Sequence, residues 1–207
     1  MIFSTDARGV LVRLKSGYGI RRLGDWAAML DDPILLWRSK RGDRKAFDLL
    51  YERHLDTLLT VAMSLLGNAG DAEDAVQEVF ASFIESLDTL TIRSNLRNFL
   101  AVCVANKSRD MLRRRNRPLA DPCGGAAPAE PAEPLDLAIR NEQVRRLLDA
   151  LAKLPYEQRE VITLHIHAGL TFRAMARALK VSLGTVQSRY RYGLDNLKAA
   201  LNGEGQT

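Results

Sequence analysis

The sequence has few of the residues that build disulfide frameworks, metal centres and nucleophilic catalytic sites. Among 207 residues there are two cysteines and three histidines. Cys103 lies in an apolar helical pattern and Cys123 in a stretch rich in proline, glycine and alanine, which gives neither disulfide nor metal-site spacing. His165 and His167 are two apart on an expected helix, so their side chains diverge by roughly 200° and cannot share a metal ion without help. We therefore expect a reduced cytoplasmic protein with no metal and no cofactor.

Signatures of catalysis and of membrane insertion are also scarce. No glycine-rich phosphate loop follows a strand-like segment, and no serine or cysteine has an evident base partner. Residues 1–22 contain no continuous apolar core, so neither a secretory signal nor membrane insertion is expected. An enzyme is therefore not expected, and a metal-dependent enzyme is the weakest of three functional hypotheses.

Strand-like alternation is almost absent, whereas helical spacing of apolar residues recurs with start and stop signals. The predicted fold class is all-α. Helices are expected to begin at Asp32 as an N-cap, after Asp43, after the N-cap Asp71 and near Ser94. The helix after Asp43 is expected to end at Gly67. These four helices should form one compact domain.

A segment with little that could pack divides the helical patterns into two groups. Between Arg117 and Asp136 the chain has five prolines and two glycines, which predicts a flexible linker. Beyond it, helices are expected at about 135–154, after Pro155, after the N-cap Thr171 and over 181–201. The last two helices and their short turn predict a helix-turn-helix.

The resulting domain prediction has four parts. They are an N-terminal extension over 1–31, a helical domain over 32–117, a linker over 118–135 and a helix-turn-helix domain over 136–202. Three alternatives stay open for residues 1–31: disorder, a misassigned start site or a regulatory arm.

The last expected helix is apolar on one side and polar on the other. Gln187, Ser188 and Arg191 lie on the polar side, with Tyr192 at its margin. Their donors and acceptors match base edges and phosphates in the major groove of DNA. Arg189 lies closer to the packed side, where we expect it to contact a phosphate or an acidic neighbour. The alternative is the solvated face of an ordinary amphipathic helix.

A second polar feature is a run of positive charge. From Lys107 to Arg117 the chain has one lysine and five arginines against a single aspartate, and its net charge is +5 with a pI near 9.4. Basic side chains at a helix C-terminus also complement the helix dipole, but this segment contains more basic residues than that role needs. Phosphate contact is therefore expected.

A third feature has the opposite sign. In "DAEDAVQEVF", Glu73, Asp74, Gln77 and Glu78 lie off the apolar stripe. Acidic residues also stabilise a helix when they lie near its N-terminus, and this role is sufficient to explain Asp71 and Glu73. Gln77 and Glu78 lie further along and fit a docking surface for a basic partner protein better.

Together these features resemble the extracytoplasmic-function (ECF) group of bacterial RNA polymerase sigma factors, from about Asp32 to Leu201. The matching motifs are "GDRKAFDLLYERH", "DAEDAVQEVF", "NFLAVCVANKSRDMLRRRNR", "LAKLPYEQREVITL", "GLTFRAMARAL" and "GTVQSRYRYGLDNL". The sequence departs from the family at three positions: Phe99 stands for a usual Trp, Ala174 for a frequent Glu and Leu183 for a frequent Pro. The resemblance implies a factor that directs core polymerase to promoters by reading the −35 element and opening the −10 element.

The resemblance also implies roles for particular residues. Contacts with the β′ clamp helices of core polymerase are implied for Asp74, Gln77 and Glu78. Contacts with −10 DNA are implied for Asn106, which would capture a flipped base, and for Lys107, Arg109, Arg113, Arg114, Arg115 and Arg117. Contacts with −35 DNA are implied for Thr185, Gln187, Ser188, Arg189, Arg191 and Tyr192.

The implied partners are core RNA polymerase, through its β′ clamp helices and β flap, promoter DNA, and an anti-sigma factor, since sequestration is common in the family. The competing hypothesis is a stand-alone helix-turn-helix regulator that uses its first domain as a sensor. That regulator would bind specific DNA tightly without polymerase, whereas the acidic helix favours the sigma factor.

Overall fold

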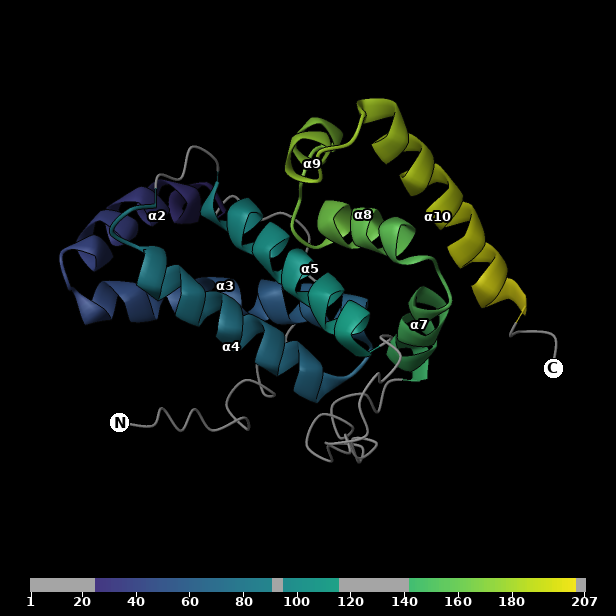
Figure 1. Cartoon of the computed structure of the whole chain (residues 1–207), viewed down its shortest axis with the longest axis horizontal. Helices are drawn as coiled ribbons and strands as arrows, with labels where there is room; N and C mark the ends of the chain where they lie inside the picture. Colours follow the sequence, from purple (N-terminus) through teal and green to yellow (C-terminus); the bar gives the residue numbers. More distant parts are fainter. Residues whose placement is uncertain (1–24, 91–94, 116–141, 204–207) are drawn as a thin grey trace.

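A computed structural model of the chain describes residues 25–90, 95–115 and 142–203, with 25–31 described by their backbone alone. All regular structure in these residues is helical, which confirms the all-α prediction. The N-terminal helices are α2 (Asp25–Lys40), α3 (Arg44–Leu66), α4 (Ala69–Ser86) and α5 (Leu96–Arg115). The C-terminal helices are α7 (Glu142–Ala152), α8 (Tyr156–Ile166), α9 (Phe172–Ala178) and α10 (Leu183–Gly203) (Figure 1). The predicted linker lies outside the described residues.

The ends of α3 are set by the local signals that the sequence contains. The Asp43 carboxylate accepts a hydrogen bond from the Ala46 amide at 3.3 Å, as an N-cap does. At the other end Gly67 has φ 79°, a left-handed conformation that glycine adopts without a steric penalty. Its amide donates to the Met63 carbonyl. The predicted start and end of this helix are confirmed.

The first helix begins earlier than the sequence predicts. α2 begins at Asp25, so Pro33 lies inside it and Asp32 is not its N-cap, which corrects that prediction. The Asp32 carboxylate instead points to α3, where it lies 2.9 Å from Arg53 Nη1 and 3.1 Å from His54 Nε2. The side chains of Asp32 and His54 are both buried. A buried polar contact therefore joins α2 to α3.

This contact makes the stability of the protein sensitive to acid. Burial raises the pKa of Asp32, but its ion pair with His54 and its hydrogen bond and ion pair with Arg53 outweigh burial and lower that pKa. Because the folded pKa lies below the unfolded value of about 3.9, the stabilisation is complete above that pH. It is lost as the pH falls through the folded pKa. We expect Asp32→Asn to lower the free energy of unfolding at pH 7 by about 3 kcal/mol.

Urea denaturation followed by circular dichroism at several pH values measures both effects. The wild type should lose stability below about pH 4 more steeply than Asp32→Asn, because the variant has no carboxyl to protonate at this site. Asp48→Asn, at an exposed position on α3, is the matched control. Equal acid profiles in the wild type and Asp32→Asn would contradict the prediction.

The start of α4 also differs from the prediction. The helix begins at Ala69 and its N-cap is Asn68, whose Oδ1 accepts a hydrogen bond from the Asp71 amide at 2.8 Å. Asp71, the predicted N-cap, lies within the first turn, where its charge complements the helix dipole. Asn and Asp cap helices almost equally well, so two such residues three positions apart leave the start ambiguous in the sequence.

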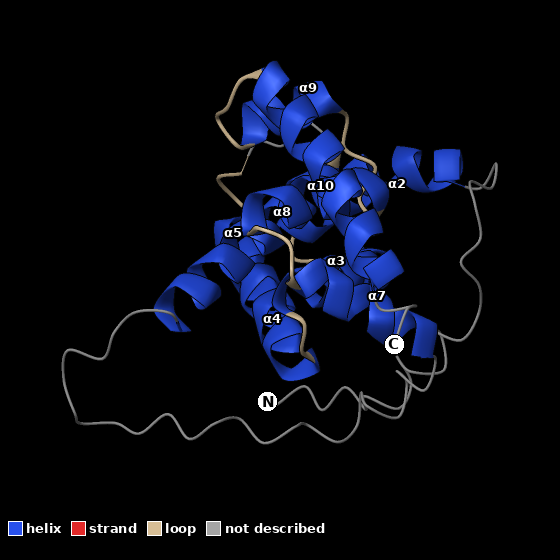
Figure 2. Ribbon diagram, turned by 90° about the vertical axis from the view of Figure 1, so that its right-hand side faces the viewer, coloured by secondary structure: helices blue, strands red, loops and turns tan. Residues whose placement is uncertain are grey.

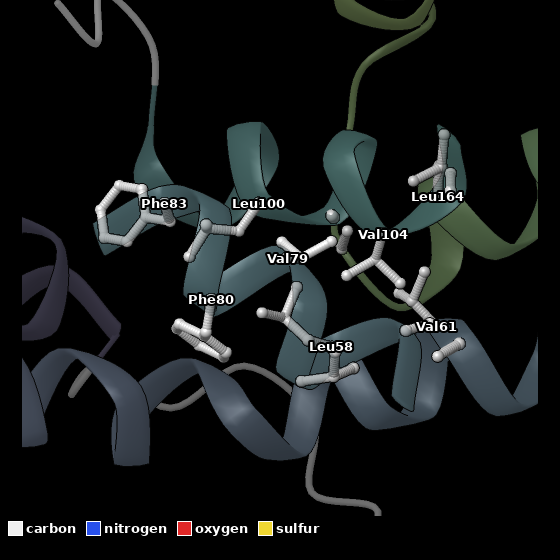
Figure 3. Packing of buried hydrophobic residues seen from close by; sticks show 14 of the residues in the cluster. Leu58, Val61, Val79, Phe80, Phe83, Leu100, Val104 and Leu164 are labelled. Atoms are coloured by element: carbon white, nitrogen blue, oxygen red, sulfur yellow. The ribbon is translucent and has the colours of Figure 1, made fainter. Parts of the chain in front are cut away.

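The N-terminal helices α3, α4 and α5 share a dense apolar core, part of which is shown in Figure 3. Its members include Leu58, Val61, Val79, Phe80, Phe83, Leu100 and Val104, all buried. Burial of each such side chain stabilises the fold by roughly 1.5–3 kcal/mol. The core fixes the outward faces of α4 and α5 relative to each other.

Helices α9 and α10 form the predicted helix-turn-helix. Thr171 caps α9 by accepting a hydrogen bond from the Ala174 amide at 3.2 Å, as predicted. Gly193 of α10 is buried, and a Cβ there would lie 2.8 Å from Ile162 Cδ1 of α8. Glycine thus lets α10 cross α8 closely. The helical spacing of the sequence also predicts Leu194 on the packed side of α10, but its side chain is 37% exposed.

The C-terminal helices also pack on the N-terminal helices, which the sequence does not predict. α7 and α8 contact α3, and α8 lies beside α5 in both views of the molecule (Figures 1 and 2). Leu164 of α8 belongs to the same hydrophobic cluster as Val61 and Val104 (Figure 3). Periodicity identifies the apolar face of a helix, but the helix that covers it depends on the tertiary fold.

Candidate nucleic-acid and protein interfaces

The outer face of α10 presents most of the predicted DNA-reading residues. Gln187, Arg191 and Tyr192 are exposed. Arg191 Nη2 donates to the Tyr192 hydroxyl at 3.1 Å, and its guanidinium carbon lies 4.8 Å from the Tyr192 ring centroid. Ser188 is half-buried, and its hydroxyl lies 2.9 Å from the Gly184 carbonyl, to which it donates. A hydroxyl already bonded within its own helix has less freedom to donate to a base.

Thr185 and Arg189 lie at the edge of this face. The Thr185 amide donates to Ser182 Oγ at 3.0 Å, so this residue belongs to the first turn of α10. Arg189 is half-buried, and its charge partly opposes the rise that burial causes in the pKa of Glu160 on α8.

The predicted basic surface of α5 divides into two parts. Its last turn contains three exposed arginines, Arg113, Arg114 and Arg115. Asn106, seven positions before Arg113, is also exposed. The remaining described members, Lys107 and Arg109, are half-buried and contact acidic side chains on α4 and α8. Arg117 lies outside the described residues. Arg115 lies 3.9 Å from the Asp71 carboxylate of α4, so Arg113 and Arg114 are the freest cations of the described set.

The predicted docking residues of α4, Asp74, Gln77 and Glu78, are all exposed. Glu78 contacts Lys107 of α5. The structure thus brings a predicted polymerase-binding residue and a predicted DNA-binding residue together at the boundary of α4 and α5. Glu73 is half-buried, and burial, followed by the charge of Asp74, raises its pKa. The acidic face of α4 is held beside the basic face of α5.

One charged pair joins α5 to α8 and is not predicted by the sequence. Glu160 of α8 is fully buried, and Arg109 Nη2 of α5 donates to it at 2.5 Å from either carboxylate oxygen. Burial raises the pKa of Glu160, whereas the charge of Arg109 and its hydrogen bond act in the opposite direction. Glu160 adjoins Val161 and lies one turn before Leu164, on the apolar side of the helix. A carboxylate at such a position signals a buried partner, but its spacing does not identify that partner.

The two histidines near the end of α8 lie in packed surroundings. His165 Nδ1 lies 2.8 Å from the Leu170 carbonyl, and its ring lies 4.8 Å and 5.0 Å from the ring centroids of Phe172 and Tyr190. Burial lowers the pKa of His167. Within residues 25–90, 95–115 and 142–203, no three His, Cys, Asp or Glu residues gather in a way that could hold a metal ion. No helix in the described part of the chain is long and apolar enough to cross a membrane.

Two protein-family models match the chain. Sigma-70 region 2 matches residues 50–118, which include α4 and α5, and Sigma-70 region 4 matches residues 144–197, which include α9 and most of α10. A curated relative is the ECF RNA polymerase sigma factor EcfG of Rhodopseudomonas palustris (strain TIE-1). It is 32% identical over 150 residues, which cover 72% of this chain and 81% of the relative.

Two solved structures are similar to most of the chain. CnrH, determined in complex with the cytosolic domain of CnrY, has a TM-score of 0.61 and 28% identity, covering 83% of this chain and 97% of that one. The sigma factor RpoE of Bartonella quintana, determined with the anti-sigma factor NepR, has a TM-score of 0.59 and covers 76% of this chain and 98% of that one. At 22% identity it supports the fold alone. With both sigma-70 regions in order and a relative of this type, the chain belongs to the extracytoplasmic-function family of RNA polymerase sigma factors.

Proposed function

We propose that this sigma factor directs core RNA polymerase to promoters by assigning separate contacts to three helices. α10 reads the −35 duplex, α5 captures the opened −10 strand and α4 binds the β′ clamp helices. The observation that carries this proposal is the outer face of α10, where Gln187 and Arg191 are exposed. The opposite side of that helix is held against α8 at Gly193, so the polar face has a fixed direction.

The predicted domain boundaries fit this division of contacts. The helical domain over 32–117 would hold polymerase and the melted strand, and the domain over 136–202 would bind duplex DNA and the β flap. The linker over 118–135 would let the two act on separate promoter elements. In this scheme the chain catalyses no reaction itself, and it acts in the cytoplasm, where its polymerase works. CnrH, which is 28% identical, was determined in complex with the cytosolic domain of CnrY, and this supports a regulatory protein partner here, for which we propose an anti-sigma factor.

Run-off transcription with purified core polymerase on a promoter library tests the function directly. Transcripts that depend on the added chain, and that share two sequence elements upstream of their start sites, are the expected result. A gel-shift assay without polymerase distinguishes the competing regulator. Tight and specific duplex binding by the pure chain, together with no stimulation of core enzyme, would contradict the sigma-factor function.

Substitution of the α10 side chains should relax promoter choice. A good bidentate contact to a base edge contributes about 1–3 kcal/mol of discrimination, or roughly 5- to 150-fold. We therefore expect Gln187→Ala and Arg191→Ala each to reduce −35 selectivity by a factor in this range in competition between promoters. Lys198→Ala, exposed further along α10, is the matched control and should keep the wild-type preference. Unchanged selectivity in both variants would contradict the role of this face.

A further inference from the structure

One face of α2 exposes two large apolar side chains. Leu35 is buried in the core, whereas Ile34 and Trp37 are 58% and 54% exposed. Ile34 and Trp37 are three positions apart, so their side chains lie on the same face of the helix. Single exposed apolar residues are common on protein surfaces, but adjacent large ones indicate a place where a partner binds. No function assigned so far to α4, α5 or α10 uses this face.

A cation lies against the ring of Trp37. The guanidinium carbon of Arg41, the residue that directly follows α2, lies 4.0 Å from the ring centroid. Within the described residues Arg41 forms no ion pair, so its charge is available to an anion. An exposed aromatic ring with a guanidinium beside it is the combination by which proteins stack unpaired bases and hold the adjoining phosphates.

The charge around this face favours an anionic occupant. Arg38 and Lys40 lie in the last turn of α2, next to Arg41, and the one carboxylate nearby is that of Asp43, which pairs with Arg38 at 2.7 Å. Residues 1–24 contain five basic residues and one acidic residue, so they carry the same sign of charge as this end of α2. A nucleic-acid strand is therefore a better occupant of the face than the chain's own N-terminal segment.

Lys40 places the face beside the route from α4 to α5. Its Nζ donates to the Leu90 carbonyl at 2.7 Å, and Leu90 lies between the end of α4 and the start of α5 at Leu96. The opposite end of α5 leads through residues 116–141 to the helices that we assign to the −35 element. Because the −35 element lies upstream of the −10 element, the end of α5 nearer to α2 corresponds to the downstream side of the opened strand.

We propose that Ile34, Trp37 and Arg41 form a stacking platform for an unpaired base of the opened strand, just downstream of the −10 element. Trp37 provides the ring on which the base stacks, Ile34 adds apolar surface on the same face, and Arg41 binds the adjoining phosphate. This inference rests on the proposed function of α5, which delivers the opened strand to the platform. The platform accepts any base, because every base has an aromatic face.

Binding of labelled single strands to the holoenzyme, followed by fluorescence anisotropy, tests the platform. One oligonucleotide ends with the −10 element and a second continues downstream of it. We expect Trp37→Ala to weaken binding of the longer strand by about 5- to 150-fold, the range for one stacked base, and to leave the shorter strand unaffected. Trp37→Tyr keeps an aromatic ring and should retain most of the affinity.

The matched control is Ile166→Ala, which removes an apolar side chain that is 56% exposed on α8. It should bind both strands with wild-type affinity. Arg41→Gln should weaken binding of the longer strand by about two- to fivefold, the range for an exposed cation beside an aromatic ring. Circular dichroism verifies the helical content of each variant.

The emission of Trp37 reports the contact directly. Trp26 is the other tryptophan of the chain, so Trp26→Phe leaves Trp37 as the single indole. In the full chain carrying this substitution, titration with the longer strand should quench the emission, because a stacked base quenches an excited indole. The shorter strand should leave the emission close to that of the free chain.

The possible results separate this inference from the proposed function. Wild-type affinity of Trp37→Ala for the longer strand, with its helical content intact, would overturn the platform, and so would a loss of affinity for core polymerase alone, which would indicate a protein-binding face. If Trp37→Ala loses helical content, the emission decides, and an emission that the longer strand leaves unchanged overturns the platform. If the longer strand quenches Trp37 but the wild-type holoenzyme does not bind the shorter strand, the platform is supported and the proposed function of α5 is wrong.

Discussion

Charge reversal at Arg113, Arg114 and Arg115 is expected to abolish promoter opening while leaving polymerase binding within about twofold of the wild type. These side chains are exposed in the last turn of α5 and lie beyond the part of that helix that α8 contacts. The charges of Arg113 and Arg114 are therefore available to phosphates, and Arg115, 3.9 Å from Asp71 of α4, is exposed enough to exchange that partner for a phosphate. The docking face that we propose for polymerase lies on α4, so it should survive the change.

The size of the effect follows from counterion release. Each phosphate neutralised on a single strand contributes about −0.7 to the slope of log affinity against log salt concentration. Three lost contacts should reduce that slope by about 2 in magnitude, and three glutamates add repulsion. We expect at least about a 100-fold loss of affinity for a single-stranded −10 oligonucleotide at physiological salt.

Permanganate footprinting of unpaired thymines on a promoter complex measures the opening step. The matched control reverses Arg44, Lys45 and Arg145, which are exposed on α3 and α7 and change the net charge by the same amount. The control should melt the promoter with nearly wild-type efficiency. Normal melting by the α5 variant would contradict the assignment of this basic turn.

Sequence alone predicts the features that depend on neighbouring residues. The ends of α3 were predicted because Asp43 and Gly67 act within a few residues of their partners. The exposure of Gln77 and Glu78 follows from their position off an apolar stripe, which is also a local property. Local features of this kind predict which face of a helix is polar, and that prediction does not require the tertiary fold.

The features that the sequence does not predict depend on distant partners. Asp32 lies within α2 and its carboxylate accepts a hydrogen bond from Arg53, which lies 21 positions away. Arg109 was predicted to face DNA, but it binds Glu160, which lies 51 positions away. A basic residue on the predicted polar face of a helix gives the same sequence pattern whether its side chain is free or forms an ion pair. The division of the α5 cations into free and paired residues therefore needs the tertiary structure.

The double substitution Gln77→Ala/Glu78→Ala is expected to weaken binding to core polymerase by about 30-fold, or about 2 kcal/mol, without loss of folding. Both side chains are exposed on α4, so their removal creates no cavity. Truncation of central interface residues commonly has effects of this size because their partners lose charge and hydrogen-bond complementarity. A quantitative pull-down or fluorescence anisotropy with purified core enzyme measures the affinity.

The matched control is Ser82→Ala/Glu85→Ala, which removes one polar and one acidic side chain near the other end of α4. It should bind core polymerase with wild-type affinity if the docking surface is local, and a loss equal to that of the test variant would indicate a general charge effect. Wild-type affinity of Gln77→Ala/Glu78→Ala would contradict the docking surface.

The contact between Glu78 and Lys107 requires one further comparison. Removal of Glu78 also releases a lysine that we assign to the −10 strand, so Glu78→Ala alone could act through DNA. Gln77 makes no such contact with α5 among the hydrogen bonds of the described residues. Gln77→Ala should therefore weaken polymerase binding while leaving oligonucleotide affinity unchanged. If Glu78→Ala changes oligonucleotide affinity but not polymerase affinity, Glu78 positions Lys107, and the docking surface of α4 reduces to Asp74 and Gln77.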